Sequence, residues 1–285
     1  MSRIELKHID KFYGSNHVLR DINLTIEDGD FMTLLGPSGC GKTTTLRVVS
    51  GLEKPQNGIM TIDGVEMINA DDAYYAEPSK RGLNLVFQSY ALWPHMTVYN
   101  NIAFGLKIQK MDKAEIDRRV RTAMRRVALD YDKLAQRSVF ELSGGQMRRV
   151  AIAGVLAMEP QTLVLDEPCA GLDPRGREEI LGLISDLHRE SGATIVMVSH
   201  SMDDVAALAE RVIVMNHGKV AMDGTPREIF SRGEELRAIG LDVPQAVELA
   251  QKLREKGFDV PEGIYKIEEV RAAVEAIVGK GGRHA

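Results

Sequence analysis

Short apolar segments alternate with stretches of helical spacing along most of the chain. This alternation predicts an α/β domain with a largely parallel central sheet. Continuous apolar runs are typical of strands buried on both faces, and they predict central strands at 31–35, 83–87, 163–165 and 195–198. Residues 22–26 alternate apolar and polar side chains instead. We therefore expect an antiparallel strand with one solvent-exposed face near the N-terminus.

Residues 42–50 have helical spacing, which predicts a helix that ends at Gly51. Most of the region from about 90 to 160 is also predicted to be helical. After about Glu235 two amphipathic helices follow, one opened by Pro244 and one starting near Ile267. Their apolar stripes must be buried, either against the main domain or against a twin subunit. We therefore expect a domain at 1–235 and a helical dimerisation appendage at 236–285.

Composition narrows the classes of partner. The chain has 285 residues and a net charge of −5, which is of the wrong sign for a protein that binds nucleic acid through its phosphates. No apolar run is long enough to cross a bilayer, so a role at a membrane requires a partner that does the crossing. The first residues have no long apolar core of the kind found in signal peptides. With only two cysteines, a reducing compartment fits best.

A glycine-rich segment between a predicted strand and a predicted helix matches the P-loop pattern. Its residues are Gly36, Pro37, Ser38, Gly39, Cys40, Gly41, Lys42 and Thr43, and Thr44 is a further candidate phosphate contact. Glycines let main-chain N–H groups turn towards phosphate oxygens, and the helix N-terminus adds its positive end. We expect Lys42 at the β- and γ-phosphates of a nucleotide and Thr43 at a Mg²⁺ ion. The alternative is a chance glycine-rich turn.

Two acids, Asp166 and Glu167, end the apolar run of the third predicted central strand. Carboxylates at such a position are costly unless a cation or a water molecule needs them. We expect Asp166 to hold Mg²⁺ and Glu167 to act as a general base, an effect typically worth about 10²–10⁴-fold in rate. The alternative is that both acids are surface residues or cap a helix.

A second glycine-rich turn, Leu142-Ser143-Gly144-Gly145-Gln146, precedes a long predicted helix. Such a turn is an anion site, and a chain that already has one phosphate cradle would use it for another part of the nucleotide or for another subunit's nucleotide. A simple helix-capping loop is the alternative. Together with the P-loop and the Leu165-Asp166-Glu167-Pro168 segment, this turn resembles the ABC ATPase family.

The resemblance implies further roles for residues that match the family's pattern. Tyr13 matches an aromatic residue that stacks on adenine, although a core tyrosine is the alternative. Gln88 matches a glutamine that contacts Mg²⁺ and the attacking water and links the site to a membrane partner. Asp173 matches a loop that crosses to the other subunit, and with Pro174 it also forms a good helix start. His200 matches a switch histidine at the γ-phosphate, and Ser201 with Asp204 would form a capping box behind it.

The resemblance also implies an architecture and a mode of action. The fold would be an α/β P-loop NTPase with a mixed sheet core, an antiparallel β subdomain, a helical subdomain at about 90–160 and a C-terminal helical appendage. Two subunits, identical or paralogous, would close over two ATP molecules, with Ser143, Gly145 and Gln146 of one subunit covering the ATP of the other. The dimer would drive an importer from the cytoplasmic face of a prokaryotic membrane, below a separate membrane protein, without inserting into the membrane itself.

The two ends of the chain resemble different branches of the family. Segments 36–45, 89–94 and 100–106 resemble the ATPases of carbohydrate importers, whereas the chain from about Phe140, including 147–154 and 240–245, resembles energy-coupling-factor ATPases. We therefore expect an engineered chimera joined between about Leu129 and Leu142, with a natural mosaic or a divergent family member as the alternative. In a chimera, coupling to transport would be uncertain. A soluble, non-transport ABC ATPase is the rival function.

Overall fold

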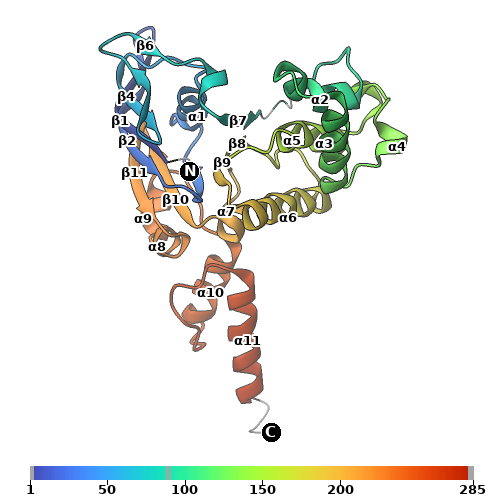
Figure 1. The fold of residues 1–285 in the computed structure, drawn as a ribbon. Coiled ribbons are helices and arrows are strands. Elements are labelled where there is room, and N and C mark those ends of the chain that lie inside the picture. Colours follow the sequence, from blue (N-terminus) through green and yellow to red (C-terminus); the bar gives the residue numbers. More distant parts are fainter. Residues whose placement is uncertain (1–2, 88, 90, 282–285) are drawn as a thin grey trace.

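A computed structural model describes residues 3–87, 89 and 91–281 and shows two β-sheets flanked by helices (Figure 1). The smaller sheet is antiparallel, with strand order β2-β1-β4-β5-β6. Its strands are β1 (Ile4–Tyr13), β2 (Asn16–Ile26), β4 (Asn57–Ile62), β5 (Val65–Asn69) and β6 (Tyr74–Tyr75). The alternating segment at 22–26 lies in β2, which confirms the antiparallel piece predicted near the N-terminus.

The larger sheet is mixed, with strand order β11-β10-β3-β9-β8-β7. Its strands are β3 (Phe31–Leu35), β7 (Leu83–Val86), β8 (Thr162–Asp166), β9 (Thr194–Val198), β10 (Arg211–Asn216) and β11 (Lys219–Gly224). All neighbouring pairs are parallel except β10 with β11. The four predicted central strands are therefore confirmed, to within a residue or two at their ends.

Helices of the main body pack on both faces of the larger sheet and form a lobe beside it (Figure 1). They are α1 (Lys42–Ser50), α2 (Val98–Ile108), α3 (Lys113–Arg126), α4 (Tyr131–Leu134), α5 (Gly144–Leu156), α6 (Pro174–Ser191) and α7 (Met202–Leu208), with short 3₁₀ turns at Pro78–Lys80 and Val139–Glu141. Helix α1 ends at Gly51, whose φ of 81° lies in the left-handed region that glycine adopts without strain. The helical region predicted at about 90–160 corresponds to α2–α5.

The central strands are buried on both sides because each side belongs to a different core. Phe31, Leu163 and Ile195 pack with the helical lobe. Their neighbours along the strands, Met32 and Val164, pack with α1 and the antiparallel sheet. Successive side chains of a strand point to opposite faces, so a continuous apolar run fills both cores.

The C-terminal region forms α8 (Pro226–Ser231), α9 (Gly233–Ala238), α10 (Gln245–Glu255) and α11 (Ile267–Gly281), of which α10 and α11 extend away from the body (Figure 1). Residues Leu236, Leu241 and Val243 still pack into the body. Beyond them, Ala250 and Val270 belong to a separate small core between the last two helices. The apolar stripes of the appendage are therefore buried mainly against each other.

Within residues 3–87, 89 and 91–281, no helix combines the length and the apolar character needed to span a membrane.

Candidate functional site

The phosphate cradle lies between β3 and α1, and its glycines are required by its geometry. Gly36, Gly39 and Gly41 have φ angles of 154°, 78° and 110°. A Cβ at Gly36 would lie 2.3 Å from the Met215 carbonyl oxygen, and a Cβ at Gly41 would lie 2.7 Å from Leu19 Cδ2. Side chains are therefore excluded by contacts with β10 and β2 as well as by the backbone conformation.

Lys42 lies inside the loop that it follows. Its side chain is buried, and Nζ donates hydrogen bonds to the carbonyl oxygens of Gly36, at 2.6 Å, and Pro37, at 3.0 Å. Cys40 is also buried and fills the loop, with Sγ 3.7 Å from Nζ. The ammonium group is thus held at the cradle, while Ser38 and Gly39 form the exposed rim.

Tyr13 ends β1 beside the start of α1. The residue is 43% exposed, so it is not a core tyrosine. The hydroxyl group lies against the side chains of Glu53 and Thr44, and Lys11 Nζ lies 4.8 Å from the ring centroid. An exposed aromatic face at this position is available for stacking on a base.

Asp166, the last residue of β8, faces the start of α1. The hydroxyl group of Thr43 donates a hydrogen bond to Asp166 Oδ1 at 3.3 Å, although the two residues are 123 positions apart. Burial raises the pKa of Asp166, as expected of a carboxylate that a cation would compensate. A hydroxyl and a carboxylate oxygen beside a phosphate cradle are donors that Mg²⁺ prefers, so these residues fit the ion. Gln88, expected as a third contact, lies outside the described residues.

Glu167 follows β8 with a φ of 54°, an uncommon conformation for a side chain of this size. Burial, and then the neighbouring Asp166, raise the pKa of Glu167 to about 7. His200, just beyond β9, places Nε2 at 2.8 Å from Glu167 Oε1. Burial, and then the Lys42 charge, lower the pKa of His200, which favours the neutral form of the imidazole. A carboxyl group with a pKa near 7 suits a general base.

Ser201 caps α7 as expected, but the capping box is only half formed. Its hydroxyl oxygen accepts a hydrogen bond from the main-chain N–H of Asp204 at 3.2 Å. The reciprocal bond is replaced, because the Asp204 carboxylate accepts from Arg177 Nε at 2.8 Å instead. The prediction missed Arg177 because nothing in the local spacing of 200–204 points to a residue on α6.

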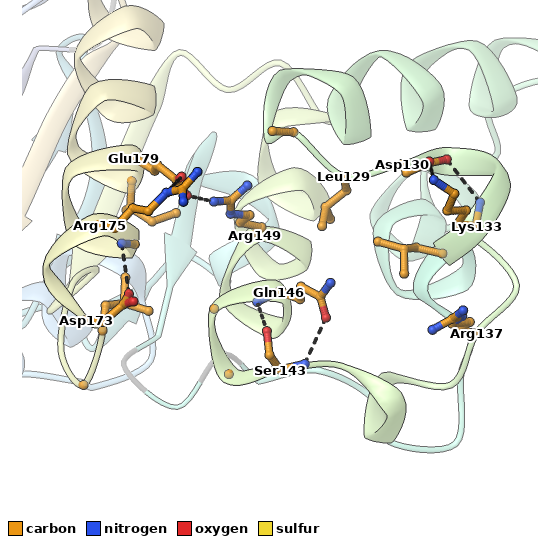
Figure 2. A pocket seen from close by; sticks show the side chains of 18 residues that line it. Leu129, Asp130, Lys133, Arg137, Ser143, Gln146, Arg149, Asp173, Arg175 and Glu179 are labelled. Atoms are coloured by element: carbon orange, nitrogen blue, oxygen red, sulfur yellow. Dashed lines mark hydrogen bonds and ion pairs between the residues drawn. The ribbon is translucent and has the colours of Figure 1, made fainter.

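The second glycine-rich turn forms the start of α5. Ser143 Oγ accepts from the Gln146 N–H at 3.3 Å, and Gln146 Oε1 accepts from the Ser143 N–H at 3.0 Å, which is a complete capping box. Ser143 and the main chain of Gly144 and Gly145 line a cavity of about 1010 Å³ between the helical lobe and α6 (Figure 2).

The start of α6 also lines this cavity. Asp173 Oδ1 accepts from the Gly176 N–H at 3.0 Å, so the predicted N-cap and its Pro174 are confirmed. Figure 2 shows that Arg149 and Arg175 both reach Glu179 across this wall. Sequence reasoning missed these three residues, and also Lys133 and Arg137 on the opposite wall, because no motif connects them.

Those expected site residues that the structure describes therefore form two groups on one chain. The cradle at 36–44, the carboxylates and His200 lie together at the ends of β3, β8 and β9. The turn at 143–146 and Asp173 lie together at the cavity. None of residues 36–44, all of which the structure describes, lines that cavity. In the arrangement that the family resemblance implies, the first group of one subunit would face the second group of another subunit across a bound nucleotide.

Comparisons with known proteins agree with this arrangement. A sequence model of the family described as "ABC transporter" matches residues 19–170. The energy-coupling factor transporter ATP-binding protein EcfA2 of Clostridium tetani is 47% identical over 251 residues, covering 88% of this chain and 87% of the relative. The spermidine/putrescine import ATP-binding protein PotA of Haemophilus ducreyi is 45% identical over 233 residues, 82% of this chain but only 61% of the relative.

The fold is also found in a solved structure. The ATP-binding cassette MJ0796, a dimer in a post-hydrolysis state with bound ADP and phosphate, superposes with a TM-score of 0.70 at 31% identity, covering 78% of this chain and 98% of that chain. These likenesses, together with the α/β fold, support the expected P-loop NTPase of the ABC type.

The expected chimera finds no support. The alignment with EcfA2 covers 251 of the 285 residues and so necessarily crosses the expected junction at 129–142. Natural proteins thus have a continuous likeness to both halves. Nor does any of these likenesses support a soluble, non-transport function. The chain belongs to the ABC transporter family and is one of its ATP-hydrolysing subunits.

Proposed function

We propose that this chain is the motor subunit of an importer, working as a dimer below a separate membrane protein. The observation that carries the proposal is the division of the site: the cradle lies against its carboxylates, and the Ser143 turn with Asp173 lines a separate cavity that no residue of 36–44 lines. A second subunit is required to bring one half against the other. The dimer of MJ0796 with ADP and phosphate supports this arrangement.

The described residues have distinct tasks in such a dimer. Main-chain N–H groups of the cradle and Lys42 bind the phosphates, and Tyr13 stacks on the base. Thr43 and Asp166 would hold Mg²⁺, which supplies positive charge at the phosphates. Glu167 accepts a proton from the attacking water, and His200 orients that water and the terminal phosphate. For Gln88, which lies outside the described residues, we keep the proposed role at Mg²⁺ and the attacking water.

A second subunit, identical or paralogous, completes the pocket. Its Ser143, Gly145 and Gln146 cover the terminal phosphate through the N-terminus of α5, and its Asp173 loop crosses to the cradle. Two bound ATP molecules thereby hold two subunits together. After hydrolysis these contacts are lost and charges repel, so the dimer opens.

The membrane partner is proposed to bind near the segment that follows Gln88. Trp93 is 46% exposed there, and its ring lies 5.3 Å from Phe104 and 6.1 Å from His95. Exposed aromatic residues are enriched at protein interfaces. The names of EcfA2 and PotA, a transporter and an importer subunit, favour uptake at the cytoplasmic face of a prokaryotic membrane.

The variant Glu167→Gln tests the proposal directly. It keeps the size of the side chain and removes the base, so we expect ATP and Mg²⁺ to bind while turnover falls at least about 10²-fold. Sedimentation with ATP and Mg²⁺ should show a stable dimer. Glu77→Gln, an exposed carboxyl outside the site, is the matched control and should behave as the wild type. Full turnover by Glu167→Gln, or a protein that stays monomeric with ATP, would overturn the proposal.

A further inference from the structure

Arg177 connects two parts of the site that are distant in the sequence. It lies one turn into α6, where its main-chain N–H donates to the carbonyl oxygen of Asp173 at 3.0 Å. Asp173 is the N-cap of that helix. The position of Arg177 therefore follows the position of the Asp173 loop, because the first turn of α6 joins them.

The side chain of Arg177 reaches across to α7. Nε donates to Asp204 Oδ1 at 2.8 Å, and Nη2 donates to the hydroxyl oxygen of Ser201. Asp204 is only 4% exposed, so its charge depends on this partner. The planar guanidinium group binds both residues at a defined separation, which a lysine could not do.

The residue held by this fork lies next to His200. Ser201 follows the histidine directly and caps α7, a helix of only seven residues. The His200 side chain is 55% exposed, so packing leaves much of the ring unconstrained. Its orientation towards Glu167, 2.8 Å away, therefore depends on the backbone that Ser201 and the cap hold in place.

We propose that Arg177 is a positioning residue for His200. Through Arg177, the position of the Asp173 loop determines how His200 is oriented towards the general base Glu167. The inference rests on the proposed function, which places that loop against a second subunit. When the partner orders the Asp173 loop, the first turn of α6 moves as a unit and the guanidinium fork transmits the shift to Ser201. Hydrolysis is thereby linked to dimer closure by side chains of one protomer.

The competing role for Arg177 is purely structural: it would only neutralise the buried carboxylate of Asp204. The two roles predict different kinetics. A positioning residue affects the chemical step, whereas nucleotide affinity depends on the cradle, which Arg177 does not touch. A residue acting through His200 must also lose its effect once His200 is removed.

Steady-state hydrolysis by Arg177→Ala and Arg177→Lys in the full chain tests this. We expect kcat to fall about tenfold in Arg177→Ala, with KM for ATP within about twofold of the wild type. Arg177→Lys keeps a positive charge beside Asp204, so it should melt close to the wild-type temperature and still show reduced kcat. Arg189→Ala, an exposed arginine near the other end of α6, is the matched control and should change neither constant.

The decisive measurement repeats the substitution in a His200→Ala background. If Arg177 acts through His200, adding Arg177→Ala should lower the residual rate by less than about twofold. The same factor of loss in both backgrounds, or wild-type kcat in Arg177→Lys and Arg177→Ala, would overturn the inference and leave the proposed function intact. A wild-type protein that hydrolyses no ATP would overturn both.

Discussion

Glu167 Oε1 lies 2.8 Å from His200 Nε2, although 33 positions separate the two residues in the chain. Strands β8 and β9 are parallel neighbours, with Asp166 paired to Val198, so their carboxyl ends deliver both side chains to one edge of the sheet. In open α/β sheets this edge is where ligands bind. The pair places a largely buried carboxyl group beside an imidazole whose lowered pKa favours its neutral form, a combination suited to moving a proton near neutral pH.

Glu167 should titrate close to neutrality. Burial and Asp166 raise its pKa to about 7, so protonated Glu167 accumulates as the pH falls through 7. Only the ionised form can accept a proton, and kcat/KM for ATP should therefore decline below pH 7. Carboxyl ¹³C NMR of the nucleotide-free protein measures the pKa, with Glu167→Gln identifying the signal. A titration midpoint near the ordinary glutamate value of about 4.3 would contradict the prediction.

Lys42→Ala should lose most of the nucleotide affinity. The buried ammonium group is held by two loop carbonyls at the cradle, and a hydrogen bond to a charged group is worth about 1.5–3 kcal/mol. This corresponds to binding weakened by about one to two orders of magnitude in an ATP titration. Lys113→Ala, an exposed lysine on α3, is the control. Near-normal affinity in Lys42→Ala would remove this residue from the cradle.

Two glycine substitutions should change stability in opposite directions. At Gly41, with a φ of 110°, the Cβ of alanine would lie 2.7 Å from Leu19 Cδ2, so Gly41→Ala should destabilise the fold. Gly182 is exposed in α6 and a Cβ there meets nothing within 4 Å, so Gly182→Ala should stabilise it by about 0.5–1 kcal/mol. Chemical denaturation measures both. A Gly41→Ala protein as stable as the wild type would refute the steric argument.

Removing residues 245–285 should leave the ATPase body folded. Ala250 and Val270 belong to a core of the appendage itself, and Leu241 and Val243, which pack into the body, stay in place. The deletion takes the partly buried Val247 and Tyr265 from the edge of the body core. We propose that the appendage contributes to dimerisation, so the shortened protein should associate less in the absence of nucleotide. Sedimentation velocity measures this. Identical sedimentation of the two proteins would show that the appendage packs only within its own chain.

The amino-acid sequence alone determined the local elements and the motifs. Strand β3, helix α1 and its end at Gly51 were all predicted, because continuous apolar runs, capping residues and glycines act within a few positions. The P-loop and the two acids after β8 were found for the same reason, since their chemistry depends on short fixed spacings. The apolar stripes of α10 and α11 also indicated that these helices need a partner surface.

Only the tertiary structure decided which of these pieces meet. The contact of Thr43 with Asp166 and that of Arg177 with Asp204 depend on the order of strands in the sheet and on the packing of α6 beside α7. The spacing of residues within one segment does not predict the order of strands, because that order arises from the burial of whole faces against one another. For the same reason the sequence could suggest two phosphate-binding turns, but only the fold shows that one chain holds them apart.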